Sequence, residues 1–163
     1  MGGVLSSLRN RGEFIGDLGE TILLDAPAST IAAKQLLVIG LGDETALSLD
    51  TLRVVGRVAA TEAIHLKATS VSFAPMIRDQ GNVTIGVGEG DAAVVESMLL
   101  AYDTSQRLQK QHFAAPFAID RWTIEAGPKF YAEVTEKVRQ GVEIVTRAIA
   151  KRDATPYSTS ENR

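Results

Sequence analysis

Residues 35–42 read Gln-Leu-Leu-Val-Ile-Gly-Leu-Gly, and this stretch is the strongest single indication of the fold class. The run 36–39 is apolar on both sides of an extended chain, which predicts a strand buried on both faces of a helix-covered sheet. After it the apolar spacing changes to steps of three and four, which predicts an amphipathic helix capped by Ser48 or Asp50. The buried positions of that helix are Leu52, Val55, Ala59, Ala63 and Leu66.

The segments on either side of this strand and helix extend the pattern. Residues 3–11 favour a short helix, and residues 20–25 favour a strand that Ala26-Pro27-Ala28-Ser29 ends. Val71, Phe73 and Pro75 alternate with small or polar residues, which predicts a strand with the proline near its end. Residues 83–87 predict a second short strand, and a turn at 79–82 would join the two as a hairpin.

The C-terminal half predicts two long helices with a strand between them. The first helix opens at Asp91, which we expect to be its N-cap, and its buried stripe is Val94, Val95, Met98, Leu99 and Tyr102. Residues 110–116 form a loop, and 117–125 are strand-like. Pro128 starts the longest helix, whose stripe is Phe130, Val134, Val138, Val142, Val145 and Ile149.

Strands that alternate with long amphipathic helices predict an α/β fold, in which helices flank a layered, mixed sheet. The chain has 163 residues, of which 45% are apolar, and this suits one domain with a sizeable core. We assign residues 1–152 to that single domain and residues 153–163 to a polar, mobile tail.

Composition excludes several classes of protein. The chain carries 17 basic and 20 acidic residues, a net charge of −3, so no nucleic-acid partner is indicated. It has no cysteine, which excludes disulfides and thiolate chemistry. No apolar run approaches the ~20 residues that span a bilayer, and the first residues lack the apolar core of a secretory signal. We therefore expect a cytoplasmic protein without a membrane partner.

The motifs of catalysis and metal binding do not occur in this sequence. The two histidines, His65 and His112, belong to no serine nucleophile elbow and to no His-Glu-x-x-His motif. The carboxylates Asp79, Glu89, Asp91 and Glu96 lie close in sequence, but their spacing matches no metal-binding loop. We therefore assign no catalytic residue, no cofactor-binding residue and no metal ligand, and we expect no cofactor.

Two glycine-rich turns leave one binding hypothesis open. Each follows a predicted strand and precedes a predicted helix, where backbone amides can hold a small anionic ligand. Carboxylates at 43–44 and at 89 and 91 would repel a phosphate, and the dinucleotide spacing Gly-x-Gly-x-x-Gly is missing from both turns. They are therefore either tight turns or weak ligand-binding turns, and the glycines concerned are Gly40, Gly42, Gly86, Gly88 and Gly90.

Five stretches, taken in order and spacing, resemble the N-terminal domain of the leucyl aminopeptidases (peptidase family M17). They are FIGDLGETILL at 14–24, LLVIGLG at 36–42, the small-residue helix at 52–63, AVVESMLLAY at 93–102 and the segment 141–156. Ser97 stands where the family usually has a glycine. Thr146-Arg147-Ala148-Ile149 keeps the family's Ala-Arg-Asp-Leu run only loosely.

The resemblance implies a macro-domain-like fold without the catalytic part of the family. The lysine and carboxylate ligands of that part and its Asn-Thr-Asp-Ala-Glu-Gly-Arg signature have no counterpart in these residues. Three hypotheses follow. The first is a stand-alone, non-catalytic domain that serves assembly or protein interaction, as a homo-oligomer or with a protein partner. The second is a macro-like module that binds a nucleotide or an ADP-ribose-type ligand, and the third is a chain that pairs with a separate catalytic partner.

Overall fold

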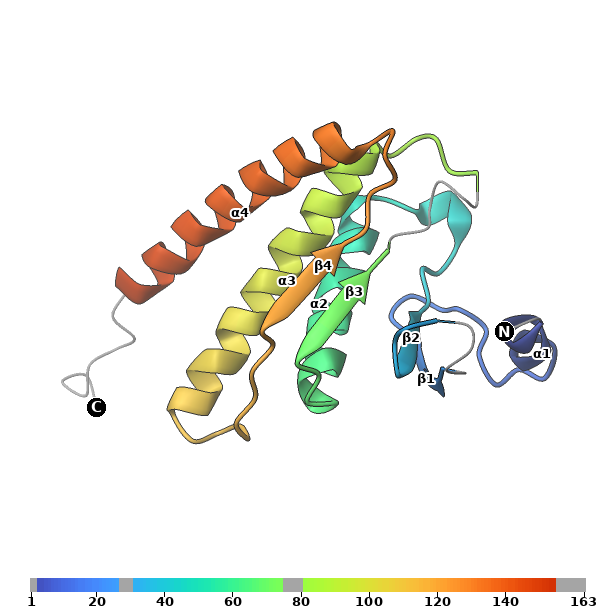
Figure 1. The fold of residues 1–163 in the computed structure, drawn as a ribbon, viewed down its shortest axis with the longest axis horizontal. Helices are drawn as coiled ribbons and strands as arrows, with labels where there is room; N and C mark the ends of the chain where they lie inside the picture. Colours follow the sequence, from blue (N-terminus) through green and yellow to red (C-terminus); the bar gives the residue numbers. More distant parts are fainter. Residues whose placement is uncertain (1–2, 27–30, 75–80, 155–163) are drawn as a thin grey trace.

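The computed structural model describes residues 3–26, 31–74 and 81–154 (Figure 1). Helices and strands alternate along the described chain, in agreement with the α/β class that the sequence predicts. The elements are α1 (Val4–Asn10), β1 (Thr21–Asp25), β2 (Gln35–Ile39), the 3₁₀ turn η1 (Glu44–Ala46), α2 (Leu49–His65), β3 (Ser70–Phe73), α3 (Val87–Lys110), β4 (Arg121–Ile124) and α4 (Tyr131–Ala154).

The four described strands form two separate two-stranded sheets, where the sequence analysis expects one mixed sheet. Strand β1 pairs antiparallel with β2, with Thr21 opposite Ile39 and Asp25 opposite Gln35. Strand β3 pairs parallel with β4, from Ser70 opposite Arg121 to Phe73 opposite Ile124. The apolar residues 36–39 of β2 are only half-buried, so the expectation of a strand buried on both faces is wrong.

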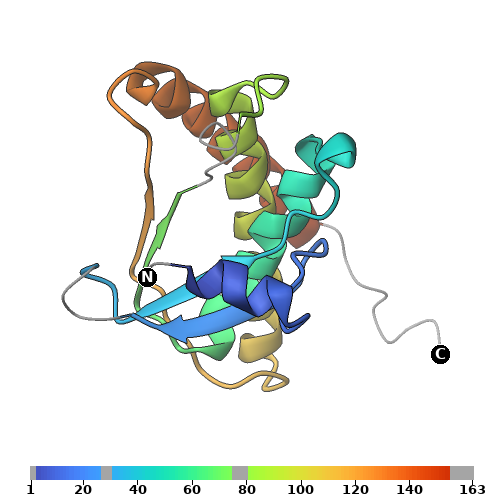
Figure 2. The ribbon, with the colours of Figure 1, turned by 90° about the vertical axis from the view of Figure 1, so that its right-hand side faces the viewer.

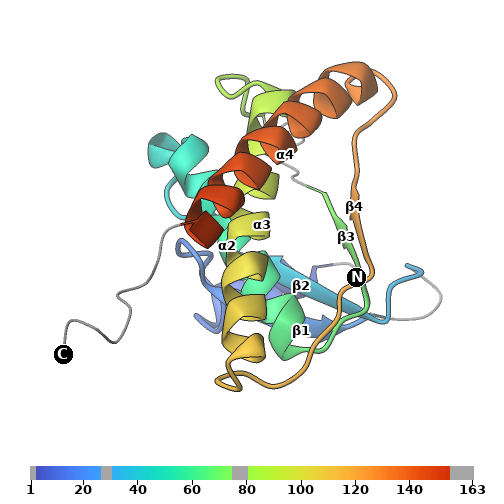
Figure 3. The ribbon, with the colours of Figure 1, turned by 90° about the vertical axis from the view of Figure 1, so that its left-hand side faces the viewer.

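The helices supply most of the core. Helix α3 lies between α2 and α4, which Figures 1 and 3 show from two sides, and it contacts both of them extensively. One buried cluster consists of Leu52 of α2, Ala93 and Val94 of α3, and Ile85 just before α3, and Phe73 of β3 packs against it. A second lies further along α3, towards β4 and α4, and consists of Ala60, Val95 and Met98.

Helix α2 begins where its capping residues dictate. The Ser48 hydroxyl accepts a hydrogen bond from the Thr51 amide at 3.3 Å, and the Thr51 hydroxyl accepts one from the Ser48 amide at 3.2 Å. This reciprocal capping box satisfies two amides that the first helical turn leaves without partners. It confirms Ser48, rather than Asp50, as the N-cap.

Residues 83–86 are not a strand, and the predicted hairpin is wrong. The Asn82 side-chain oxygen accepts hydrogen bonds from the amides of Thr84 at 3.1 Å and Ile85 at 3.2 Å, which turns the chain directly into α3. Helix α3 begins at Val87, four residues before the predicted start. Pro75, Asp79 and Gln80 lie outside the described residues.

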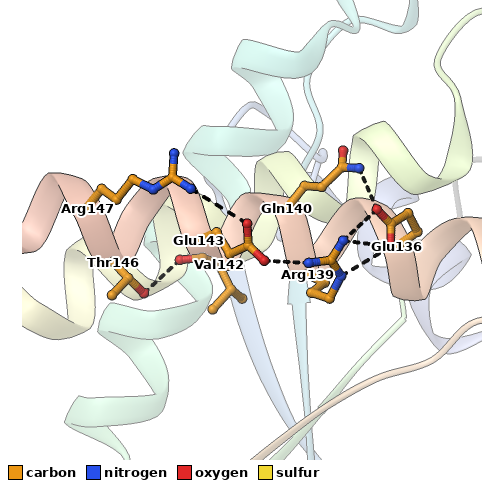
Figure 4. Close-up of polar contacts among 7 residues, drawn as sticks. All are labelled: Glu136, Arg139, Gln140, Val142, Glu143, Thr146 and Arg147. Atoms are coloured by element: carbon orange, nitrogen blue, oxygen red, sulfur yellow. Dashed lines mark hydrogen bonds and ion pairs between the residues drawn. The ribbon is translucent and has the colours of Figure 1, made fainter.

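Helix α4 packs on α3 along one stripe and turns a charged face away from it (Figure 4). Arg139 bonds both Glu136 and Glu143, and its hydrogen bonds lower the pKa of Glu136. These pairs are exposed, so each contributes little to stability. The predicted tail starts at residue 153, whereas α4 continues through Ala154, and residues 155–163 lie outside the described part.

None of the helices in the described part of the chain is both long and apolar enough to cross a lipid bilayer.

Candidate functional site

The first glycine turn packs tightly against the loop that precedes β1. The Gly40 amide donates to the Glu20 carbonyl at 2.7 Å, and the Gly42 amide donates to the Gly16 carbonyl at 2.9 Å. A Cβ at position 40 would overlap the backbone of Gly16 and Asp17, so only glycine allows this approach. Both amides therefore already have partners inside the protein.

A small cavity of about 280 Å³ opens beside this turn. It contains one guanidinium, that of Arg9 on α1, together with the carboxylates of Asp43 and Glu44. Asp43 accepts hydrogen bonds from the Thr45 hydroxyl and the Thr45 amide, both at 2.8 Å, and these bonds lower its pKa. Asp43 is thus anionic at neutral pH and would repel a phosphate, as the sequence analysis expects.

The second glycine turn is not a loop before a helix but part of α3 itself. Gly86 is its N-cap, and the Gly90 amide donates to the Gly86 carbonyl at 2.9 Å within the first turn. The Gly88 amide donates at 3.1 Å to the carboxylate of Glu133, which comes from α4. A carboxylate of the protein therefore already lies at this helix N-terminus, where an anionic ligand would be expected to bind.

Asp91 is the residue whose environment departs furthest from the sequence prediction. It is not the N-cap: it lies in the second turn of α3, its side chain is 1% exposed, and neither carboxylate oxygen has a hydrogen-bond partner. Burial, and secondarily the nearby charge of Glu133, raise its pKa to about 7. The spacing of Asp91, Val94, Val95 and Met98 places it on the buried stripe, and this was the signal that could have revealed it.

The other histidines and carboxylates that the sequence singles out do not lie together in one site. His65 ends α2 and His112 follows α3 with a positive φ of 62°, and both side chains are exposed. Glu89 pairs with Lys137 and Glu96 with Arg53, each at 3.8 Å. Within residues 3–26, 31–74 and 81–154, no group of three or more side chains could hold a metal ion.

An apolar groove of about 290 Å³ lies between β4 and α4. Tyr131 stands at its rim with 65% of its surface exposed, and no motif in the sequence indicated this groove. Its apolar lining comes from Ile124, Ala126, Val134 and Val138. We call it the β4–α4 groove.

Comparison with known proteins decides the family. Residues 1–112 match the model of the N-terminal domain of the cytosol aminopeptidase family, which is more than half of the chain. The chain belongs to this family. The match confirms the resemblance that the sequence analysis draws from residues 14–24, 36–42, 52–63 and 93–102.

Two curated relatives and one solved structure agree with this assignment. A probable cytosol aminopeptidase of Roseiflexus castenholzii is 32% identical over 97 residues, 59% of this chain and 19% of the relative. Another, of Geotalea uraniireducens, is 34% identical over 86 residues, 52% of this chain and 17% of the relative. The chain thus matches less than a fifth of either relative.

The structural match supports the fold. A tomato leucine aminopeptidase mutant superimposes with a TM-score of 0.60 at 19% identity, over 88% of this chain and 27% of that protein. The α/β fold predicted from the sequence is therefore that of the N-terminal region of leucine aminopeptidases.

Proposed function

We propose that this chain is a non-catalytic domain of the cytosol aminopeptidase family and acts by binding another copy of itself. The observation that carries the proposal is the β4–α4 groove with the exposed ring of Tyr131 at its rim. An apolar hollow beside an exposed apolar side chain is a common form of protein-interaction surface.

A second copy is the occupant that we propose, because the groove and the exposed ring of Tyr131 belong to the same patch. In a dimer with twofold symmetry the same patch faces itself, so Tyr131 of each copy would enter the groove of the other. The ring would contact the side chains of Val134 and Val138 there. Burying an aromatic ring of this kind is a typical source of interface energy.

Replacing Tyr131 by aspartate is expected to abolish self-association. We expect light scattering to give a multiple of 17.4 kDa for the unaltered chain at micromolar concentrations and the monomer mass for Tyr131→Asp. Phe113→Asp is the matched control, since Phe113 is 75% exposed and lies outside the groove. A monomer mass for the unaltered chain, or equal effects of both substitutions, would contradict the proposal.

A second candidate function is a macro-like module for a nucleotide or an ADP-ribose-type ligand. The cavity of about 280 Å³ beside Gly40 and Gly42 favours it, because Arg9 there could bind a phosphate. The inward hydrogen bonds of Gly40 and Gly42 and the charge of Asp43 oppose it. The amide of Gly88 in the second turn is likewise bonded, to Glu133.

Titration calorimetry with ADP-ribose separates the two candidates. If the chain is an interaction domain, we expect no heat of binding up to about 1 mM ligand, where a Kd of that size corresponds to a binding free energy of about −4 kcal/mol. A saturable signal that Arg9→Ala removes would establish the ligand-binding function instead.

We further propose that the protein is cytoplasmic. This is supported by its family, since both curated relatives are named as probable cytosol aminopeptidases.

A further inference from the structure

Charged hydrogen bonds hold one end of helix α4 on α3. Arg152 donates to the Asp103 carboxylate at 2.8 Å and to the Thr104 hydroxyl at 3.2 Å. Arg107 of α3 donates to the same Asp103 oxygen at 2.8 Å. The Asp103 side chain is only 13% exposed, so salt and water screen these contacts little. The C-terminal end of α4 is therefore anchored to α3.

The N-terminal end of α4 meets α3 beside a buried carboxyl group. Asp91 is 1% exposed, and neither of its carboxylate oxygens has a hydrogen-bond partner in the described part of the chain. Glu133, in the first turn of α4, accepts a hydrogen bond from the Gly88 amide, three residues before Asp91, and its charge disfavours the ionisation of Asp91. The two ends of α4 thus differ: opposite charges hold one end on α3, whereas like charges meet at the other once Asp91 ionises.

The other described charged groups around Asp91 have partners of their own. The contacts are Lys137–Glu89 and Arg53–Glu96 at 3.8 Å, Arg53–Asp50 at 2.7 Å and Ser72–Glu125 at 2.6 Å. Residues 81–86, which lead into α3, include no titratable side chain. Among the described residues, Glu133 is therefore the charge that acts on Asp91, and it has the same sign.

The two helices run in the same general direction. Figures 2 and 3 view the molecule from opposite sides, and in both views α3 and α4 begin near the upper edge. Helix α4 has 24 residues and is therefore about 36 Å long. Near its middle, a Cβ built at Gly141 would lie 3.5 Å from the Cβ of Ala92 of α3. A small rotation about the anchored C-terminal end would thus displace the first turn of α4 most.

The N-terminal end of α4 carries one wall of the β4–α4 groove. Tyr131, Val134 and Val138 lie in the first two turns of the helix, and Ile124 of β4 lines the other side. Val134 is 4% exposed, so its burial depends on α4 lying close to the rest of the fold. Movement of this end of α4 would therefore change the groove.

We propose that ionisation of Asp91 moves the N-terminal end of α4 away from α3 and thereby weakens self-association through the β4–α4 groove. We call this movement the opening of α4. Opening admits water to the Asp91 carboxylate, breaks the bond between Glu133 and the Gly88 amide, and separates the two charges. Glu133 is exposed, so it can move into water at little cost. The opening depends on the α3–α4 contact alone, whereas its effect on self-association rests on the proposed function.

The direction of the pH effect follows from which form binds the proton more tightly. With α4 closed, burial and then Glu133 raise the pKa of Asp91 from 3.8 to about 7. With α4 open, the carboxyl group lies in water and its pKa falls back towards the ordinary value. Low pH therefore favours the closed form. Between pH ~4 and about 7 the ratio of open to closed chains rises by up to about tenfold per pH unit, and above that range it changes little.

Hydrogen exchange of the Gly88 amide measures the opening, because this amide bonds Glu133 only in the closed form. The chain used is Tyr131→Ser, which lacks the ring needed for self-association and adds no charge near Glu133. Its exchange rate is divided by that of Tyr131→Ser/Asp91→Asn at the same pH, which cancels the chemical effect of pH on exchange. We expect this ratio to rise at least about tenfold from pH 5 to pH 8. With Asp120→Asn, at an exposed position, in place of Asp91→Asn the ratio should stay level.

A disulfide between α3 and α4 provides a second arm. The chain has no cysteine, and the distance of 3.5 Å between the Cβ of Ala92 and a Cβ at Gly141 suits a disulfide. In the variant Ala92→Cys/Gly141→Cys, oxidation should hold the helices together and make the exchange ratio independent of pH. Reduction of the same protein should restore the pH dependence.

Light scattering of chains with Tyr131 intact connects the opening to the groove. Only closed chains present an intact groove, so the apparent dissociation constant rises as the closed fraction falls. We expect this constant to be at least about tenfold higher at pH 8 than at pH 5 for the unaltered chain, and equal at the two pH values for Asp91→Asn.

Three results would overturn the inference. An exchange ratio that is independent of pH would show that α4 does not open, and a ratio that rises equally in the oxidised double-cysteine chain would place the movement outside the α3–α4 contact. A rising ratio with equal self-association at pH 5 and pH 8 would separate the opening from the groove. By contrast, a rising ratio in a chain that is monomeric at every pH would contradict the proposed function and support the opening of α4.

Discussion

Replacing Gly56 by alanine is expected to lower the free energy of unfolding by about 2–3 kcal/mol. Gly56 lies where α2 crosses α3, and a Cβ built there would overlap the carbonyl oxygen of Val94 and the hydroxyl of Ser97. The Ser97 side chain could rotate, but the Val94 carbonyl is part of the backbone of α3. The two helices would have to move apart, which loosens the core around Leu52 and Ala60. Urea unfolding followed by circular dichroism measures the change.

Gly141→Ala is the matched control, because Gly141 also lies inside a helix at a helix crossing. Its nearest neighbours are the flexible side chain of Glu96 at 3.3 Å and the Cβ of Ala92 at 3.5 Å. Alanine fits there and favours the helix by up to about 1 kcal/mol, so stability should stay level or rise. Equal losses at the two positions, or no loss at Gly56, would contradict the close crossing of α2 and α3.

Asp91→Asn is expected to stabilise the protein by about 2–4 kcal/mol at pH 8 and to have little effect at pH 4. The pKa of Asp91 is raised from 3.8 to about 7 in the folded state, first by burial and then by Glu133. The folded chain therefore binds this proton more tightly than the unfolded chain. The stability contributed by the neutral carboxyl is complete below pH ~4 and is lost as the pH rises to about 7. Asparagine has the same shape and carries no charge, so it avoids the loss.

Urea unfolding at a series of pH values checks this result. The slope of stability between pH 4 and about 7 should be smaller in Asp91→Asn and unchanged in Asp120→Asn, since Asp120 is exposed. Glu133→Gln should move the midpoint of the slope to lower pH, because it removes the second cause of the raised pKa. A pH dependence that Asp91→Asn leaves unaltered would show that this carboxylate is not buried in the folded chain.

Helices and strands whose ends and buried faces depend on neighbouring residues could be predicted from the sequence. Helix α2 has its cap at Ser48 and its apolar stripe within one segment, so its start and its buried face follow from neighbouring residues. The same holds for β1 and β2, which are short apolar runs bounded by turn residues. The family resemblance rested on the order of several such segments, and the match over residues 1–112 confirms it.

The start of α3 could not be predicted from the apolar alternation, because a turn at Asn82 and a distant contact of Gly88 decide it. Val83, Ile85 and Val87 alternate as a strand would, which led to the wrong hairpin. The Asn82 side chain turns the chain instead, and the Gly88 amide finds its partner in Glu133, 45 residues away in sequence. No local pattern contains that contact, and the early helix start moves Asp91 from the cap to the core.

The candidate sites were predictable only in part. Gly40 and Gly42 do line a cavity, as their place after a strand suggests, but Arg9 reaches it from α1. The hydrogen bonds of the two amides depend on the loop before β1, which no spacing rule describes. The β4–α4 groove forms because β4 and α4 pack side by side. The periodicity of the sequence predicts each element but not which elements pack together.

Peptide hydrolysis by the purified chain tests the central proposal, that this member of the family binds rather than catalyses. The assay measures release of leucine from a leucyl amide in the presence of zinc, manganese or magnesium ions. We expect the same background rate for the unaltered chain and for the destabilised Gly56→Ala variant. Metal-dependent hydrolysis that falls as the chain unfolds in urea would contradict the proposal, because it would locate a reactive centre in the folded domain itself.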